Sequence, residues 1–140
     1  MKKILILCSG NSCRSQMAEG FLKSFDSELE VFSAGTVPAE KINPNSVLVM
    51  DEVGIDISSQ FPQNVDEFVY QSFDYVITVC DNAKEVCPVF SGQVKHQIHI
   101  PFDDPVDATG TEEVLIVYKR VRDEIKRDFY EFYLNELKDK

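Results

Sequence analysis

A short apolar run leads directly into a polar loop in the stretch Ile4-Leu5-Ile6-Leu7-Cys8-Ser9-Gly10-Asn11-Ser12-Cys13-Arg14-Ser15. This stretch predicts a buried strand that ends near Cys8, a tight loop, and a helix that begins near Arg14. Such a connection directs the N–H groups of the loop toward one point at the positive end of the helix dipole, which suits a tetrahedral oxyanion. The same field favours ionisation of Cys8, whose thiol is therefore a candidate nucleophile.

The loop supplies a full set of candidate groups for holding an anion. The planar guanidinium of Arg14 can grip two oxygens at once. We expect Gly10 to let the backbone turn in closely, Asn11 to brace the loop through its side chain, and Ser15 to donate a hydrogen bond to the Cys8 thiolate. A cysteine and an arginine that lie near a turn by chance are the alternative. The predicted oxyanion-binding residues are Ser9, Gly10, Asn11, Ser12, Cys13 and Arg14.

Strand and helix patterns alternate along the rest of the chain. Strands are predicted over residues 3–7, 29–34, 74–79 and 96–100, and helices over 14–25, 43–53, 65–71, 82–87 and 111–137. This order predicts an α/β fold: a single domain over residues 1–140 with a doubly wound, four-stranded parallel sheet flanked by helices. Ligands bind beyond the carboxyl ends of such strands. Cys8 and Cys80 both follow a predicted strand, so we expect both at that edge.

Two further groups of residues are expected to be structural. The aromatic residues of the last predicted helix recur at helical spacing, which is more typical of a core than of a partner surface. Nothing in the sequence pairs the two histidines with Cys8. The residues concerned are Phe129, Tyr130, Phe132, Tyr133, His96 and His99.

Composition excludes several classes of partner and site. The net charge of −10 disfavours duplex nucleic acid and anionic membranes, because both reward surface lysine and arginine. The spacing of the four cysteines is not that of a structural zinc site, so no metal centre is expected. The apolar run at the start is too short for a signal peptide. We therefore expect a cytoplasmic protein with reduced thiols and no membrane contact.

Four segments carry a resemblance to a known family. They are Cys8–Ser15, Gln16-Met17-Ala18-Glu19, Ser33-Ala34-Gly35 and Phe102-Asp103-Asp104-Pro105. In these segments the chain resembles the low-molecular-weight protein tyrosine phosphatase superfamily, which contains phosphatases and thioredoxin-coupled arsenate reductases. The resemblance implies strand order 2-1-3-4 and no tightly bound cofactor. It also implies that Cys13 is structural.

Three features favour the reductase branch over the phosphatases. Phosphatases usually carry proline after the Arg-Ser pair, where this chain has Gln16, and tyrosine after Asp-Pro, where Val106 follows Pro105. The reductases carry two further cysteines in one segment, as this chain does at Cys80 and Cys87. The resemblance therefore implies an arsenate reductase of the kind that serves arsenical resistance, acting on an arsenate or phosphate-like oxyanion with thioredoxin as its reductant. We expect the protein to be a monomer.

The expected reaction is a disulfide relay. By resemblance, the Cys8 thiolate attacks arsenate, Asp104 protonates the departing oxygen, Cys80 attacks the Cys8 sulfur, and Cys87 then attacks Cys80 to leave a redox-active disulfide. If residues 80–87 are helical, the two Cα atoms lie ~10 Å apart, whereas a disulfide needs them within ~7 Å, so the segment has to unwind. The alternatives are two buried small side chains at Cys80 and Cys87, and a solvated turn at Asp104.

Two other functions remain open from the sequence. One is a phosphatase, a hydrolase that works through a phospho-cysteine intermediate at Cys8. The other is a redox- or anion-sensing module without turnover. In some reductases of this type a monovalent cation binds at matching positions, which suggests K⁺ near Asn11, Glu19 and Ser33; an exposed Glu19 and a strand-end Ser33 are the alternative.

Overall fold

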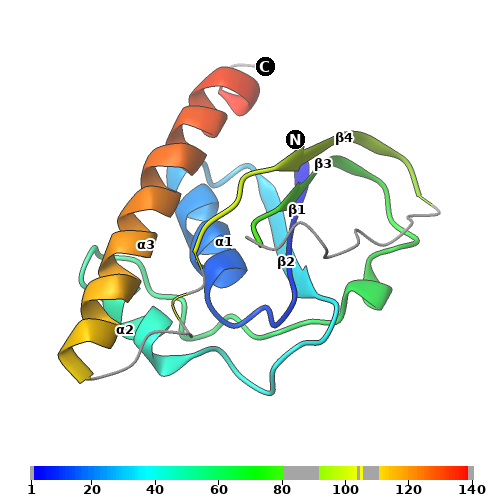
Figure 1. Cartoon of the computed structure of the whole chain (residues 1–140). Coiled ribbons are helices and arrows are strands. Elements are labelled where there is room, and N and C mark those ends of the chain that lie inside the picture. Colours follow the sequence, from blue (N-terminus) through cyan, green and yellow to red (C-terminus); the bar gives the residue numbers. More distant parts are fainter. Residues whose placement is uncertain (1, 81–91, 104, 106–110, 139–140) are drawn as a thin grey trace.

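The computed structural model describes residues 2–80, 92–103, 105 and 111–138, and the side chains of the last segment from residue 114. Four strands form one parallel sheet: β1 (Lys3–Cys8), β2 (Glu30–Gly35), β3 (Phe73–Thr78) and β4 (Val94–His99). Their order is β2-β1-β3-β4, which confirms the predicted topology. Figure 1 shows the loop that follows β1 at the edge of the sheet where β1, β2 and β3 end.

Helices α1 (Arg14–Phe25), α2 (Pro44–Asp51) and α3 (Thr111–Phe132) pack together beside one face of the sheet (Figure 1). Beneath them lies the larger apolar core, which contains alternate β1 residues such as Ile4 and Ile6. Leu5 and Leu7 point to the other face and join a smaller core that includes Val65 and Phe68. The unbroken apolar run of β1 is thus explained by burial on both faces.

Most predicted element boundaries lie within two residues of those observed, and α1 begins and ends where predicted. The helix predicted over 65–71 is wrong: only Val65–Glu67 forms a 3-10 turn, η1, capped by the Asn64 side chain. The last helix continues as a π-helix, η3 (Tyr133–Leu137). The helix predicted over 82–87 lies outside the described residues.

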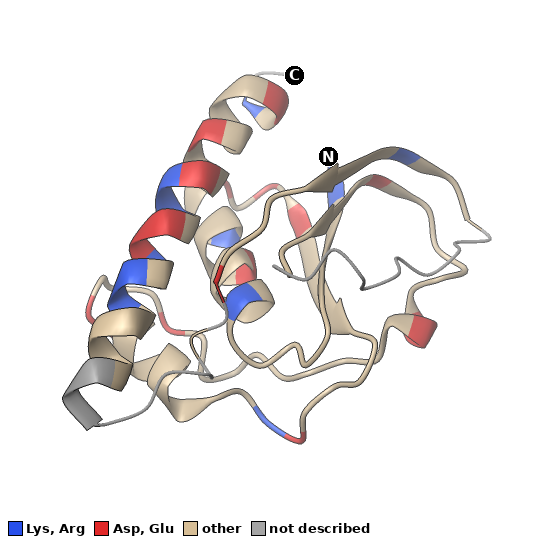
Figure 2. Ribbon diagram, in the orientation of Figure 1, with Lys and Arg blue, Asp and Glu red and all other residues tan. Residues whose placement is uncertain are grey.

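The aromatic prediction for α3 holds only in part. Phe129 and Phe132 are buried, but Tyr130 is 46% exposed. Charged residues of both signs follow the outer side of α3 (Figure 2). Within the described residues, no helix has the length and apolar character needed to cross a membrane.

Candidate active site

The loop between β1 and α1 encloses a small pocket of about 210 Å³, lined by residues 8–14. Cys8 ends β1 and is 6% exposed, and Arg14 begins α1 and is 4% exposed. The strand therefore places Cys8, and the helix places Arg14, in the lining of one cavity. The pocket also lies at the N-terminus of α1, where the helix dipole favours a negative charge.

The loop carbonyls are held from outside by the segment between β2 and α2. Ser9 O accepts from Val37 N at 2.9 Å, Gly10 O from Ala39 N at 2.9 Å, and Ser12 O from Asn43 N at 3.0 Å. In a trans peptide the N–H points opposite to the C=O of the same unit. The N–H groups that follow these three carbonyls are therefore turned away from the outer segment. This is the arrangement expected of an anion-binding loop, and the loop of residues 8–14 is called the anion cup below.

The residue that takes the unusual backbone conformation is Asn11 and not Gly10. Asn11 has φ 51°, in the left-handed region, and it is the sole non-glycine residue with positive φ among those described. A Cβ on Gly10 would meet only Ser12 Oγ at 3.6 Å, an ordinary contact. Packing within the protein therefore does not require glycine at position 10, and the expectation that Gly10 lets the backbone turn in closely stays a prediction. Asparagine tolerates the left-handed region better than most residues.

The side chain of Asn11 braces the loop, as predicted. Its Oδ1 accepts from Gln63 N at 2.9 Å and from Gln16 Nε2 at 3.1 Å, and its Nδ2 donates to Ser15 Oγ at 2.7 Å. Because Ser15 Oγ accepts here, its own proton is directed elsewhere. The bond from Ser15 to Cys8 stays a prediction.

Arg14 is anchored by the segment that precedes the candidate acid. Its Nη1 donates to Phe102 O at 3.1 Å, and Phe102 packs in the larger core. The neighbouring Asp103 pairs with Arg120 at 3.1 Å, on the surface. Asp104, the predicted acid, lies outside the described residues.

Cys80 follows β3 at the same edge of the sheet at which Cys8 ends β1. Leu7 is in register with Thr78, and Val79 N continues the pairing by donating to Leu7 O at 3.0 Å. Val79 is therefore level with Cys8, and Cys80 is the next residue along the chain, two positions after β3 ends at Thr78. Both side chains belong to the larger core and both are thiols.

Of the other two cysteines, the structure describes Cys13 but not Cys87. Cys13 is 3% exposed, and its Sγ lies 3.5 Å from the hydroxyl of Tyr118 on α3. This contact is in keeping with the structural role expected of Cys13. Cys87 lies outside the described residues.

The predicted cation position is a closed polar cluster. Glu19 is 5% exposed, so the alternative of an exposed glutamate is wrong. Glu19 Oε1 accepts from Ser33 Oγ at 2.6 Å, and Glu19 Oε2 pairs with the ammonium of Lys23 at 2.5 Å. The positive partner of Glu19 in this structure is therefore a side chain. The described residues contain no cluster of three or more His, Cys, Asp or Glu suited to a metal ion.

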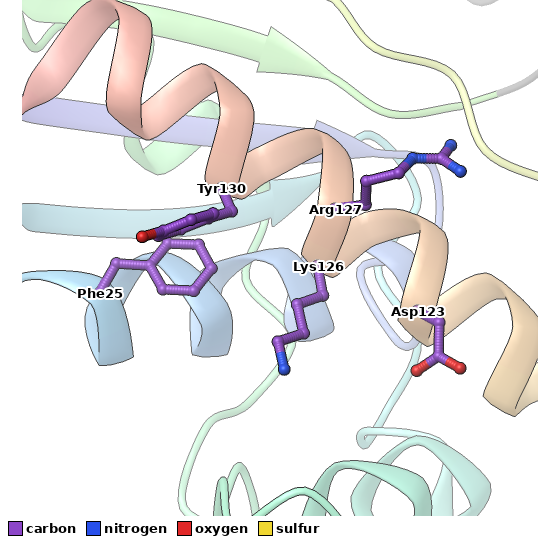
Figure 3. Close-up of a pocket in the computed structure, with 5 residues that line it drawn as sticks. All are labelled: Phe25, Asp123, Lys126, Arg127 and Tyr130. Atoms are coloured by element: carbon purple, nitrogen blue, oxygen red, sulfur yellow. The ribbon is translucent and has the colours of Figure 1, made fainter.

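A larger pocket, of about 340 Å³, lies away from the cysteines. Figure 3 shows it between α1 and α3, with Phe25 against Tyr130 on one side and the side chains of Lys126, Arg127 and Asp123 on the other. None of its lining residues is a candidate nucleophile placed beside a base, so the smaller pocket at Cys8 is the better candidate active site.

Sequence reasoning missed several residues that shape the cup. The sequence marks Gln16 through the family resemblance and as a difference from the phosphatases, but it gives no sign that Gln16 is fully buried against Asn11. Gln63 was not singled out, and it holds Asn11 through its backbone. Gly35 lies so close to the loop that a Cβ would sit 2.3 Å from Ser9 O. A glycine at the end of a strand was the one local signal available for this close approach.

Comparison with known proteins gives a consistent result. Residues 3–140 match the family described as Low molecular weight phosphotyrosine protein phosphatase. An arsenate reductase of Halalkalibacterium halodurans is 49% identical over 126 residues, which cover 89% of both chains. A solved structure described as an arsenate reductase in the phosphate binding state has a TM-score of 0.82 at 32% identity and covers 96% of this chain and 98% of its own.

A second structure is the thioredoxin-dependent arsenate reductase of Corynebacterium glutamicum, with a TM-score of 0.66 at 26% identity. That match covers 97% of this chain and 64% of the other. The family match over residues 3–140 agrees with the anion-binding loop at Cys8. The chain therefore belongs to the low molecular weight phosphotyrosine protein phosphatases.

Proposed function

We propose that this protein is an arsenate reductase that uses a thioredoxin-type dithiol protein as its reductant. The observation that carries the proposal is a second buried thiol, Cys80, which follows β3 one residue beyond the position level with Cys8, at the same edge of the sheet as the anion cup. A phosphatase needs only Cys8 and the cup. A reductase also needs a sulfur that can form a disulfide with Cys8.

Oxyanion capture is the first step. The loop amides and the guanidinium of Arg14 bind arsenate, and the helix dipole adds to their attraction. The Cys8 thiolate attacks arsenic, an As–S bond forms, and a hydroxyl leaves as water after Asp104 gives it a proton. Burial of Arg14 and its bond to Phe102 O support this role, because a guanidinium fixed in advance loses little entropy on binding.

Electron transfer follows through sulfur. Cys80 attacks the Cys8 sulfur as a thiolate; the S–S bond forms, the As–S bond breaks, and its electron pair stays on arsenic. Arsenic is thereby reduced and leaves as arsenite. Cys87 then attacks Cys80, which forms a Cys80–Cys87 disulfide and restores the Cys8 thiolate. The external dithiol reduces that disulfide, a reaction that fits the reducing cytoplasm.

No resident cofactor takes part in this scheme. A potassium ion near Asn11, Glu19 and Ser33 would compete with the Lys23 ammonium for the Glu19 carboxylate, so no step uses it.

Arsenite release in the presence of thioredoxin, thioredoxin reductase and NADPH tests the proposal. We expect repeated turnover by the wild-type protein and none by Cys80→Ser. Equal turnover by both proteins would contradict the relay.

Phosphomonoester hydrolysis is a second candidate activity, which the family match favours. The same cup would bind a phosphate ester, and Cys8 would form a phospho-cysteine intermediate that water then hydrolyses. If hydrolysis is the principal activity, Cys8→Ser abolishes it and Cys80→Ser leaves it unchanged. A comparison of both variants on an aryl phosphate and on arsenate distinguishes the two functions.

A further inference from the structure

Gln16 has a buried side chain whose role the proposed reaction does not explain. It lies in the first turn of α1 and is fully buried. Its Nε2 donates to Asn11 O at 3.0 Å, to Asn11 Oδ1 at 3.1 Å and to Phe61 O at 3.1 Å. Its Oε1 accepts from Gln60 Nε2 at 2.8 Å. Both ends of the carboxamide are therefore engaged.

The orientation of this carboxamide is fixed by its surroundings. Asn11 O and Phe61 O are backbone carbonyls and can only accept, so the group that faces them must be the NH₂ of Gln16. The same reasoning fixes the orientation of the Asn11 carboxamide, because the backbone N–H of Gln63 can only donate and therefore must face Asn11 Oδ1. Gln16 and Gln63 thus hold Asn11 from two sides, one from helix α1 and the other from the segment before η1.

Asn11 is the residue that most needs such support. A non-glycine residue in the left-handed region persists where surrounding contacts hold it, and φ at Asn11 is 51°. Its peptide units form the middle of the anion cup, because the pocket is lined by the residues on either side of it. A change in the backbone at Asn11 would turn the neighbouring N–H groups away from their common point.

We propose that Gln16 is a positioning residue for oxyanion binding: its carboxamide holds Asn11 in the left-handed conformation that aims the loop amides into the pocket. This inference rests on the proposed oxyanion cup, and it adds a residue whose side-chain hydrogen bonds go to Asn11, Phe61 and Gln60. An apolar residue at position 16 could fill the same space, but it could not donate to Asn11.

The test is inorganic phosphate binding by calorimetry, with thermal unfolding measured on the same samples. Gln16→Met keeps the length of the side chain and removes its donors, so we expect phosphate affinity to fall roughly tenfold, as the loss of hydrogen bonds to buried acceptors implies. Gln60→Met is the matched control, because Gln60 contacts Gln16 without contacting Asn11. The phosphate affinity of the Gln60→Met protein should stay within twofold of that of the wild type.

A double-mutant cycle then separates positioning from general stability. Glycine adopts positive φ without strain, so in an Asn11→Gly background Gln16→Met should cost less affinity than it does alone. If Gln16→Met fails to fold, Gln16→Leu replaces it, because leucine is neutral and also lacks the NH₂ donors. A folded Gln16 variant that binds phosphate as tightly as the wild type would overturn the inference. Absence of phosphate binding by the wild type would instead overturn the cup itself.

Discussion

Replacement of Gly35 by alanine offers a sharp test of how the cup is held. Gly35 ends β2 in register with Cys8, and a Cβ there would lie 2.3 Å from Ser9 O and 3.2 Å from Asn11 Cβ. A carbon and a carbonyl oxygen normally approach to about 3.3 Å at closest, so the loop must move by about 1 Å. Both obstacles belong to the loop itself, and one of them is backbone.

The expected consequence is a large loss of activity with a modest loss of stability. A displacement of ~1 Å near reacting groups can cost about 10²-fold in rate, whereas overpacking costs about 1–3 kcal/mol of stability. We therefore expect kcat/KM for arsenate reduction by Gly35→Ala to fall about 100-fold, with weaker phosphate binding by calorimetry.

Gly54→Ala is the matched control. Gly54 has φ 81°, so alanine there is strained, but a Cβ would meet no other atom within 4 Å. The strain costs about 1–2 kcal/mol and should leave kcat/KM and phosphate affinity unchanged. If Gly35→Ala retains the phosphate affinity and kcat/KM of the wild type, the reasoning about the loop is refuted.

Three other predictions follow from the structure. Arg14→Lys should weaken phosphate binding about 10- to 150-fold, because it loses a charge-assisted hydrogen bond worth about 1.5–3 kcal/mol; calorimetry showing less than a threefold change would contradict this. Cys80→Ser should bind phosphate normally yet release no arsenite under repeated turnover, which a colorimetric arsenite assay checks. Burial raises the pKa of Asp74, but hydrogen bonds from the Lys3 backbone and from Lys95 outweigh burial and leave that pKa below its ordinary value. The stability that Asp74 contributes is therefore present above its unfolded pKa and is lost as the pH falls through its folded pKa, so Asp74→Asn should lower the melting temperature at pH 7 and have no effect in strong acid.

The sequence alone was sufficient for the strand–loop–helix unit at the centre of the site. The apolar run before Cys8 and the periodic pattern after Arg14 are local signals, and α1 begins and ends where they predict. The order of the strands also followed, through the resemblance to a family. The edge strand β4 was less well placed. It starts at Val94 because Val94 pairs with Phe73. The residue pattern within one strand does not show where its pairing with a neighbouring strand begins.

The details that shape the cup depend on residues far apart in sequence. Asn11 and not Gly10 takes the left-handed conformation because Gln16 and Gln63 hold it there, and no local propensity reports such support. Tyr130 directly follows the buried Phe129 in the sequence, yet it is exposed beside Phe25. Periodicity assigns a face of a helix, whereas packing of the neighbouring helix decides where that face ends.

The central claim is that the Cys8 sulfur passes from arsenic directly to Cys80. It is tested most directly by a single exposure of the Cys87→Ser variant to arsenate, followed by quantification of arsenite and peptide mapping under non-reducing conditions. The account predicts a single equivalent of arsenite per protein molecule and a disulfide that links the peptides of Cys8 and Cys80. Arsenite released without that linkage would contradict it.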